Sequence, residues 1–175
     1  MKTSLKLLLL VLLANLGPSH AEGQSVSVDE NGFRLYVNGQ AAGNEQYSIR
    51  QIGPATQKRL ILRGTVEVDS PEGVLNLAPA MDVRGDALRV ADYQIQASGA
   101  EHTEIQVRVD ENRFLARIVS DRGEQLREFR AGPGSVLLDE GVVHHHHLLT
   151  PYLNQGTSVS LTVLSPRSAR QDRMT

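Results

Sequence analysis

The sequence of 175 residues lacks cysteine and tryptophan, and its aromatic residues are three phenylalanines and four tyrosines. Without cysteine, a disulfide framework, a cysteine nucleophile and the acylated cysteine of a lipoprotein are all excluded. The arginines are spread evenly along the chain, and few aromatic residues lie among them. This pattern lacks the clustered basic surface of a nucleic-acid-binding protein, so we expect no nucleic-acid partner.

Long hydrophobic runs are also scarce, and the longest lies at the N-terminus. Lys2 and Lys6 precede an apolar run from Leu7 to Leu16, and Ser19-His20-Ala21 follows as a small-x-small motif. The run is too short to span a bilayer, and its flanks are typical of a signal peptide. We therefore predict a cleaved signal peptide over residues 1–21 and a soluble, periplasmic or secreted protein with no transmembrane segment.

Most of the remaining chain alternates apolar and polar residues with the period of two that is typical of half-buried strands. The clearest case is Lys58–Val68, and Asn38-Gly39 is a strong signal for a tight hairpin. Eight or nine such strands predict a mainly β fold, a curved antiparallel meander that forms a half-barrel or open barrel. We expect a bulge near Ala91-Asp92, where the alternation changes phase, and an edge, bulge or break at Pro79.

One segment has helical spacing instead. Its apolar stripe repeats every three or four residues, and we predict a single α-helix over about 139–150, packed on the concave face of the sheet. Asp139 is the expected N-cap, and Thr150 before Pro151 is expected to end the helix. The predicted organisation is a flexible leader over 22–31, one β-rich domain over 32–164 and a disordered tail over 165–175.

The dry face of such a sheet is the candidate site. A curled sheet covered by one helix either closes into a packed core or leaves an apolar slot. In the second case, the residues expected to line the slot are Leu60, Leu62, Val66, Leu75, Leu77, Met81, Tyr93, Ile95, Val107, Phe114, Val142, His145 and Leu149.

The histidine run His144–His147 allows two interpretations. On an α-helix His144 and His147 lie one turn apart and are able to chelate one metal ion. Alternatively, His145 and His146 flank the apolar stripe beside the core and the other two are solvated. We favour the second interpretation, because the run lacks the glutamate of zinc-protease helices, and we expect no cofactor.

Signals for catalysis are weaker still. The chain has no Gly-x-Ser-x-Gly motif, and its paired acids Asp110-Glu111 and Asp139-Glu140 fall at a turn and a helix start, where acids are common for structural reasons. No lysine follows Gly132-Pro133-Gly134-Ser135, so this cluster is no phosphate-binding loop. We therefore expect a non-catalytic protein.

The layout of signal peptide, antiparallel meander, Leu137–Leu149 segment and closing strand resembles exported bacterial domains with the half-barrel of the lipoprotein carriers LolA and LolB. The resemblance implies an apolar concave face that holds acyl chains under a helical plug. Our first hypothesis is an exported binding module for an amphiphile or an apolar segment. The alternatives are a protein-interaction module with a closed core and a metal-binding domain. The expected partner is accordingly a lipid, another amphiphile or an envelope protein.

Overall fold

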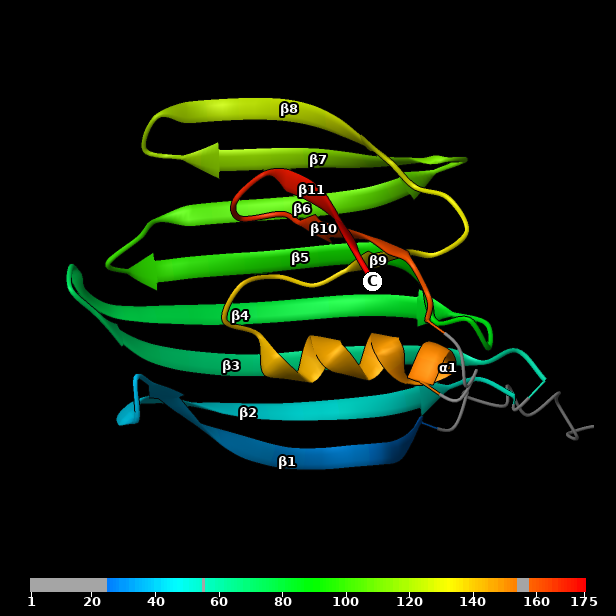
Figure 1. Ribbon diagram of the computed structural model, residues 1–175, viewed down its shortest axis with the longest axis horizontal. Coiled ribbons are helices and arrows are strands. Elements are labelled where there is room, and N and C mark those ends of the chain that lie inside the picture. Colours follow the sequence, from blue (N-terminus) through cyan, green and yellow to red (C-terminus); the bar gives the residue numbers. More distant parts are fainter. Residues whose placement is uncertain (1–24, 55, 154–157) are drawn as a thin grey trace, which may run out of the picture.

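Eight antiparallel strands form one open sheet in sequence order, from β1 at one edge to β8 at the other (Figure 1). The computed structural model describes residues 25–54, 56–153 and 158–175. The predicted signal peptide lies outside these residues. The strands are β1 Ser25–Val37, β2 Gln40–Ile52, β3 Arg59–Ser70, β4 Gly73–Arg84, β5 Arg89–Gly99, β6 Thr103–Asp110, β7 Arg113–Ser120 and β8 Gly123–Arg130. This confirms the predicted mainly β meander, and the sheet does not close into a barrel.

Local sequence determines where the strands turn and bend. Asn38 and Gly39 both have positive φ angles, of 52° and 80°, as the predicted tight hairpin between β1 and β2 requires. The pairing of β4 with β5 shifts by one residue between Asp82 and Val83, which confirms the bulge expected near Ala91-Asp92. Pro79 lies in the interior of β4, where the pairing with β3 passes from Ala80–Arg63 to Leu77–Val66 without intervening partners.

A second layer covers one face of the sheet. It contains a 3-10 helix, η1 Val143–Leu149, which continues into a short α-helix, α1 Thr150–Leu153. A three-stranded sheet lies beside it, made of β9 Ser135–Leu137, β10 Leu161–Ser165 and β11 Arg170–Met174. In Figure 1 the helical segment lies along β3, toward the β1 edge, and β9, β10 and β11 cover the central strands. Within the described ranges, no helix is long and apolar enough to cross a bilayer.

Two of the predicted boundaries are wrong. The expected leader over 22–31 is strand from Ser25 onward, because the β1–β2 hairpin extends until Ser25 pairs with Ile52. The expected disordered tail over 165–175 instead turns at Pro166–Ala169 and returns as β11. The side-chain amide of Gln171 then donates to the Arg130 carbonyl and accepts from the Arg130 N–H, which ties β11 to β8.

The helix also differs from its predicted bounds and type. It begins at Val143 rather than near Asp139, and its first seven residues have 3-10 geometry. Pro151 does not end the helical segment, which continues as α1 as far as Leu153.

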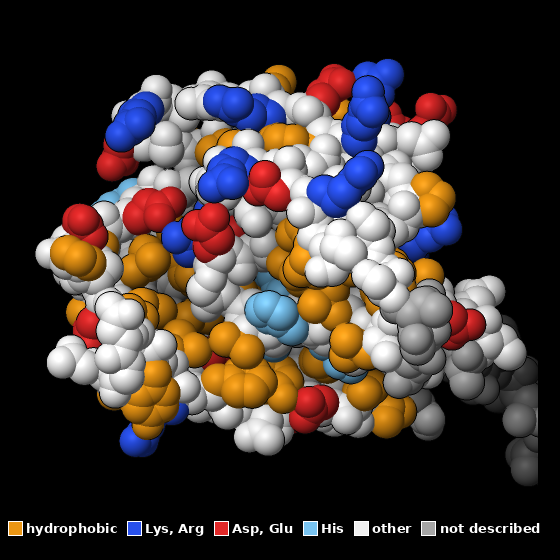
Figure 2. All heavy atoms as spheres, viewed as in Figure 1, with side chains coloured by type: hydrophobic (Ala, Val, Ile, Leu, Met, Phe, Trp, Pro, Cys, Tyr) orange, Lys and Arg blue, Asp and Glu red, His pale blue; other side chains and the backbone are white. Residues whose placement is uncertain are grey.

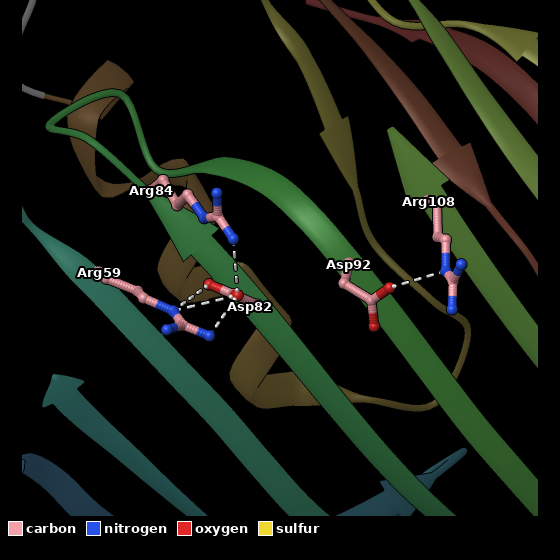
Figure 3. Close-up of polar contacts among 5 residues, drawn as sticks. All are labelled: Arg59, Asp82, Arg84, Asp92 and Arg108. Carbon is pink, nitrogen blue, oxygen red and sulfur yellow. Dashed lines mark hydrogen bonds and ion pairs between the residues drawn. The ribbon is translucent and has the colours of Figure 1, made fainter. Parts of the chain in front are cut away.

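The outer face of the sheet is polar, as the alternation predicts. Arginine and aspartate side chains pair across neighbouring strands there (Figure 3). Arg59 on β3 makes a two-pronged contact with Asp82 on β4, with Nη2 2.8 Å from Oδ2, and Arg84 approaches the same oxygen at 3.4 Å. Asp92 pairs with Arg108 at 3.6 Å. These pairs are partly solvated, so each contributes at most about 1 kcal/mol.

Candidate functional site

The helical segment 143–153, here called the lid, is attached to the sheet by a buried carboxylate. Glu45 on β2 is fully buried, although its neighbours in the same row across the inner face, Val66 and Leu77, are apolar. Its carboxylate accepts hydrogen bonds from the backbone N–H groups of Val143 and His144, at 2.7 and 3.0 Å. These are the first N–H groups of η1, which have no partner within a helix. Glu45 therefore caps η1 from a strand that is about a hundred residues away in the sequence.

The same carboxylate also holds an imidazole. Nδ1 of His144 lies 2.5 Å from Oε1 of Glu45, and both side chains are inaccessible to solvent. The His144 ring stacks on Tyr47, which stacks in turn on Phe33 of the edge strand. The ring also lies over Gly64 of β3, the cross-strand partner of Tyr47, where a β-carbon would be 2.7 Å from Cε1. The His144 ring therefore packs on the sheet in a space that is open only because residue 64 is glycine.

Gly64→Ala is expected to lower the free energy of unfolding by about 1–3 kcal/mol, because overpacking at this point pushes His144 away from Glu45. Urea titration followed by circular dichroism measures the change. Gly132→Ala is the matched control, since a β-carbon there meets nothing within 4 Å and no positive φ is involved. Equal stability of the two variants would show that the His144 ring adjusts freely.

A second buried polar group lies under the lid. Asp139, just before η1, accepts a 2.6 Å hydrogen bond from the Tyr93 hydroxyl and a 3.2 Å bond from the backbone N–H of Arg167. The backbone N–H of Asp139 donates to Nδ1 of His145 at 3.2 Å. The His145 ring packs edge-on against both Tyr93 and His144. The sheet and the β10–β11 turn therefore meet at the Asp139 carboxylate, and the lid is joined to the backbone N–H of the same residue.

Burial and hydrogen bonding set the protonation of these groups. Burial raises the pKa of Glu45, but the hydrogen bonds from His144 and Val143 outweigh it and leave this pKa lowered. Burial also lowers the pKa of His145 well below its usual value, and the neighbouring histidines add to the shift. The pKa of Asp139 is raised by burial, against the opposing effect of Tyr93 and Arg167. Under the lid Glu45 is a carboxylate and His145 is neutral near pH 7.

Beyond the lid, the inner face of the sheet continues without cover. Leu35, Gly43, Val68, Leu75 and Gly99 are cross-strand partners in one row from β1 to β5. Leu35, Val68 and Leu75 are half-buried, and the two glycines contribute no side chain. We call this row the apolar strip. Figure 2 shows hydrophobic side chains exposed at the end of the sheet that the lid does not reach.

The covering layer stops just short of this row. Gly141, two residues before the lid, lies over Leu77, because a β-carbon added to it would be 3.9 Å from Leu77 Cδ1. Leu77 is 2% exposed, whereas Leu75, two residues along the same strand and on the same face, is half-buried. The boundary between closed core and open apolar surface therefore falls between these two leucines.

Most of the residues predicted to line a slot are in the closed core. Leu60, Leu62, Val66, Leu77, Met81, Tyr93, Ile95, Val107, Phe114 and Val142 belong to one buried cluster. His145 is fully buried beside them, whereas Leu149 is half-buried and Leu75 lies in the apolar strip. The lid as observed therefore fills the central space against which these side chains pack.

The histidines do not divide as predicted. His144 and His145 are buried, His146 is exposed and His147 is half-buried, since η1 has about three residues per turn rather than 3.6. His144 Nδ1 is occupied by Glu45. In the described part of the chain, no three histidine, aspartate or glutamate side chains are grouped so as to hold a metal ion. The proposed His144–His147 pair therefore has no third ligand of these types beside it.

Comparison with known proteins finds no matching family model, no matching curated protein and no matching solved structure.

Two residues of the site were not identified as such from the sequence. Glu45 lies two residues from Tyr47 and four from Ile49, on the same face of β2. An acid at a position predicted to face the core was therefore the signal in the sequence that could have identified it. Asp139 was assigned to helix capping, a role that Glu45 fills instead.

A hollow of about 660 Å³ lies on the opposite, outer face of the sheet. Its side chains are mainly amides, hydroxyls and acids, among them Asn44, Thr65, Glu67, Gln96 and Glu104. These polar groups distinguish the outer hollow from the apolar strip on the inner face.

Proposed function

We propose that this protein is an exported, non-catalytic binding module that holds the alkyl chain of an amphiphile on the apolar strip. The observation that supports the proposal is the row Leu35, Val68 and Leu75, which extends the buried inner face past the lid and leaves it half-exposed. Each methylene fully buried there contributes about 0.8 kcal/mol, so micromolar binding, worth about 8 kcal/mol, requires roughly ten buried methylenes.

The lid sets how far such a chain can enter. The next row of the inner face after the apolar strip contains the cross-strand partners Leu77 and Val66, both buried, and Gly141 lies over Leu77. The lid is attached there through polar contacts, chiefly those of Glu45, rather than through a long apolar helix face. In the proposed mechanism Gly141 and the start of the lid move away together, the alkyl chain advances over Leu77, and the headgroup stays at the open end. The resemblance to half-barrel lipoprotein carriers supports the choice of a lipid-like ligand.

Leu75→Gln is expected to weaken binding of a fluorescent long-chain fatty acid at least about tenfold, because it places an amide in the centre of the apolar strip. Fluorescence titration of the purified protein measures the affinity. Val74→Gln is the matched control: Val74 is the next residue on β4, is 44% exposed and points to the other face, so its replacement should leave binding unchanged.

Native mass spectrometry of protein purified from the bacterial envelope identifies a bound molecule directly. A co-purified lipid with at least one alkyl chain, lost in Leu75→Gln and kept in Val74→Gln, is the expected result. Protein that carries no lipid and does not bind the fatty acid would refute the proposal. Photocrosslinking from Leu75 to an apolar protein segment, with no lipid captured, would assign the strip to a peptide instead.

A further inference from the structure

The edge strand β1 has the features of a pairing surface. It is thirteen residues long, and none of the other described strands pairs with its outer edge. Large apolar side chains along it are strongly exposed: Val26 at 59%, Val28 at 50%, Tyr36 at 59% and Val37 at 57%. Edge strands usually carry prolines or many charges that prevent association. β1 contains no proline, and its charged residues are Asp29, Glu30 and Arg34.

The opposite edge of the sheet is protected in the usual way. β8 has eight residues, of which Glu124, Arg127, Glu128 and Arg130 are charged. Gln171 of β11 also occupies the backbone N–H and carbonyl of Arg130 at its end. The two edges therefore differ: five exposed large apolar side chains lie on β1, whereas β8 carries one, Leu126.

We propose that β1 pairs antiparallel with β1 of a second copy of this chain, about a two-fold axis at Gly32. Residues directly opposite each other in an antiparallel pair point to the same face, and a two-fold axis perpendicular to the sheet preserves the faces. In the register centred on Gly32, Glu30 of one copy lies opposite Arg34 of the other, and the symmetry forms this ion pair twice. On the inner face Phe33 lies opposite Asn31, which brings the two Phe33 rings within diagonal reach across the axis.

Charge selects this register over its neighbours. A shift of the axis to Asn31 or Phe33 places Glu30 opposite Gly32 or Tyr36, so no opposite charges meet. A shift of the axis to Glu30 places the two Glu30 residues opposite each other, and a shift to Arg34 does the same for Arg34. Like charges that face each other are destabilising. The outer-face position of Glu30 and Arg34 is set by their partners on β2, Ser48 and Asn44. The result is a continuous sheet across both copies, with both lids on one side.

Sedimentation velocity over a concentration series of the mature protein tests the pairing. A dimer is expected, and Arg34→Glu is expected to raise its dissociation constant by at least about tenfold, because Glu30 then faces a second glutamate. Glu30→Arg should do the same through facing arginines. The double variant Glu30→Arg/Arg34→Glu restores both ion pairs and should return the dissociation constant to within about threefold of the original. Arg127→Glu, the same charge change on β8, is the control and should have no effect.

A wild-type protein that stays monomeric up to about 0.5 mM would overturn the proposal. So would a dimer on which both single variants have no effect, or a double variant no tighter than the single ones. Concentration-dependent growth beyond the dimer would indicate head-to-tail pairing of β1 with β8, which also contradicts it. None of these results depends on lipid binding, because the apolar strip and the outer edge of β1 are tested by different residues.

Discussion

Glu45→Ala is expected to lower the free energy of unfolding by about 3–5 kcal/mol, the cost of removing one partner of a buried polar pair. The substitution leaves the backbone N–H groups of Val143 and His144 and the Nδ1 of His144 without their acceptor. All three are shielded from water by the lid, so solvent replaces the lost bonds only if the lid lifts. Urea titration followed by tyrosine fluorescence and circular dichroism measures the loss.

Glu67→Ala provides the control for this experiment. Glu67 lies on the neighbouring strand β3 but points to the exposed outer face, so its loss should change stability by no more than about 0.5 kcal/mol. Hydrogen exchange should show the amides of Val143 and His144 unprotected in Glu45→Ala while the central strands remain protected. A loss of less than about 1 kcal/mol, with these amides still protected, would contradict the capping role of Glu45.

The sheet was predictable because its information is local. Alternation along Lys58–Val68 assigns each residue to a face, Asn38-Gly39 fixes the first hairpin, and the phase change near Ala91-Asp92 locates a bulge. Each of these signals lies within a few residues of the feature it determines. The eight strands then follow in sequence order, since short turns leave an antiparallel meander as the simplest arrangement.

The covering layer was less predictable because its structure depends on contacts between residues that are far apart in the sequence. The start of η1 depends on a carboxylate from β2, so the local preference of Asp139 for an N-cap gave the wrong boundary. The polar segment after Ser165 forms a strand only because β10 and Arg130 supply partners for it. The geometry of η1 likewise decides which histidines are buried, and the histidine run itself does not.

The candidate site reflects the same division. The residues of the dry face were predicted correctly as a set, but the sequence does not show that the lid closes over most of them and leaves Leu75 half-exposed. That distinction depends on where the lid begins, and hence on the buried acids Glu45 and Asp139, whose partners are distant in the sequence.

Acidification is expected to lower the free energy of unfolding by about 2 kcal/mol between pH 7 and pH 5, mainly through His145. Because the pKa of His145 is lowered in the folded protein, its contribution to stability is present above about pH 6.5 and is lost as the pH falls, when the unfolded chain takes up the proton. His147, half-buried with a lowered pKa, acts in the same direction but more weakly.

The carboxylates under the lid modify this dependence at lower pH. The lowered pKa of Glu45 adds a further loss below about pH 4.5, when the unfolded state binds a proton that the folded state does not. Asp139 has a raised pKa, so it takes up its proton first in the folded state and opposes the loss. Tyr93, which donates to Asp139, does not titrate in this range because its pKa is raised from an already high value.

His145→Asn isolates the histidine in this experiment. Its side-chain oxygen replaces Nδ1 as acceptor for the Asp139 N–H, but the residue cannot be protonated. Stability should therefore depend much less on pH between 7 and 5 in this variant, whatever its stability at pH 7. The exposed His146 is the matched control, and His146→Asn should keep the full pH dependence. If His145→Asn instead has the same slope as the wild-type protein, proton uptake by other groups loosens the lid, and the buried imidazole is not the acid-sensitive part of the fold.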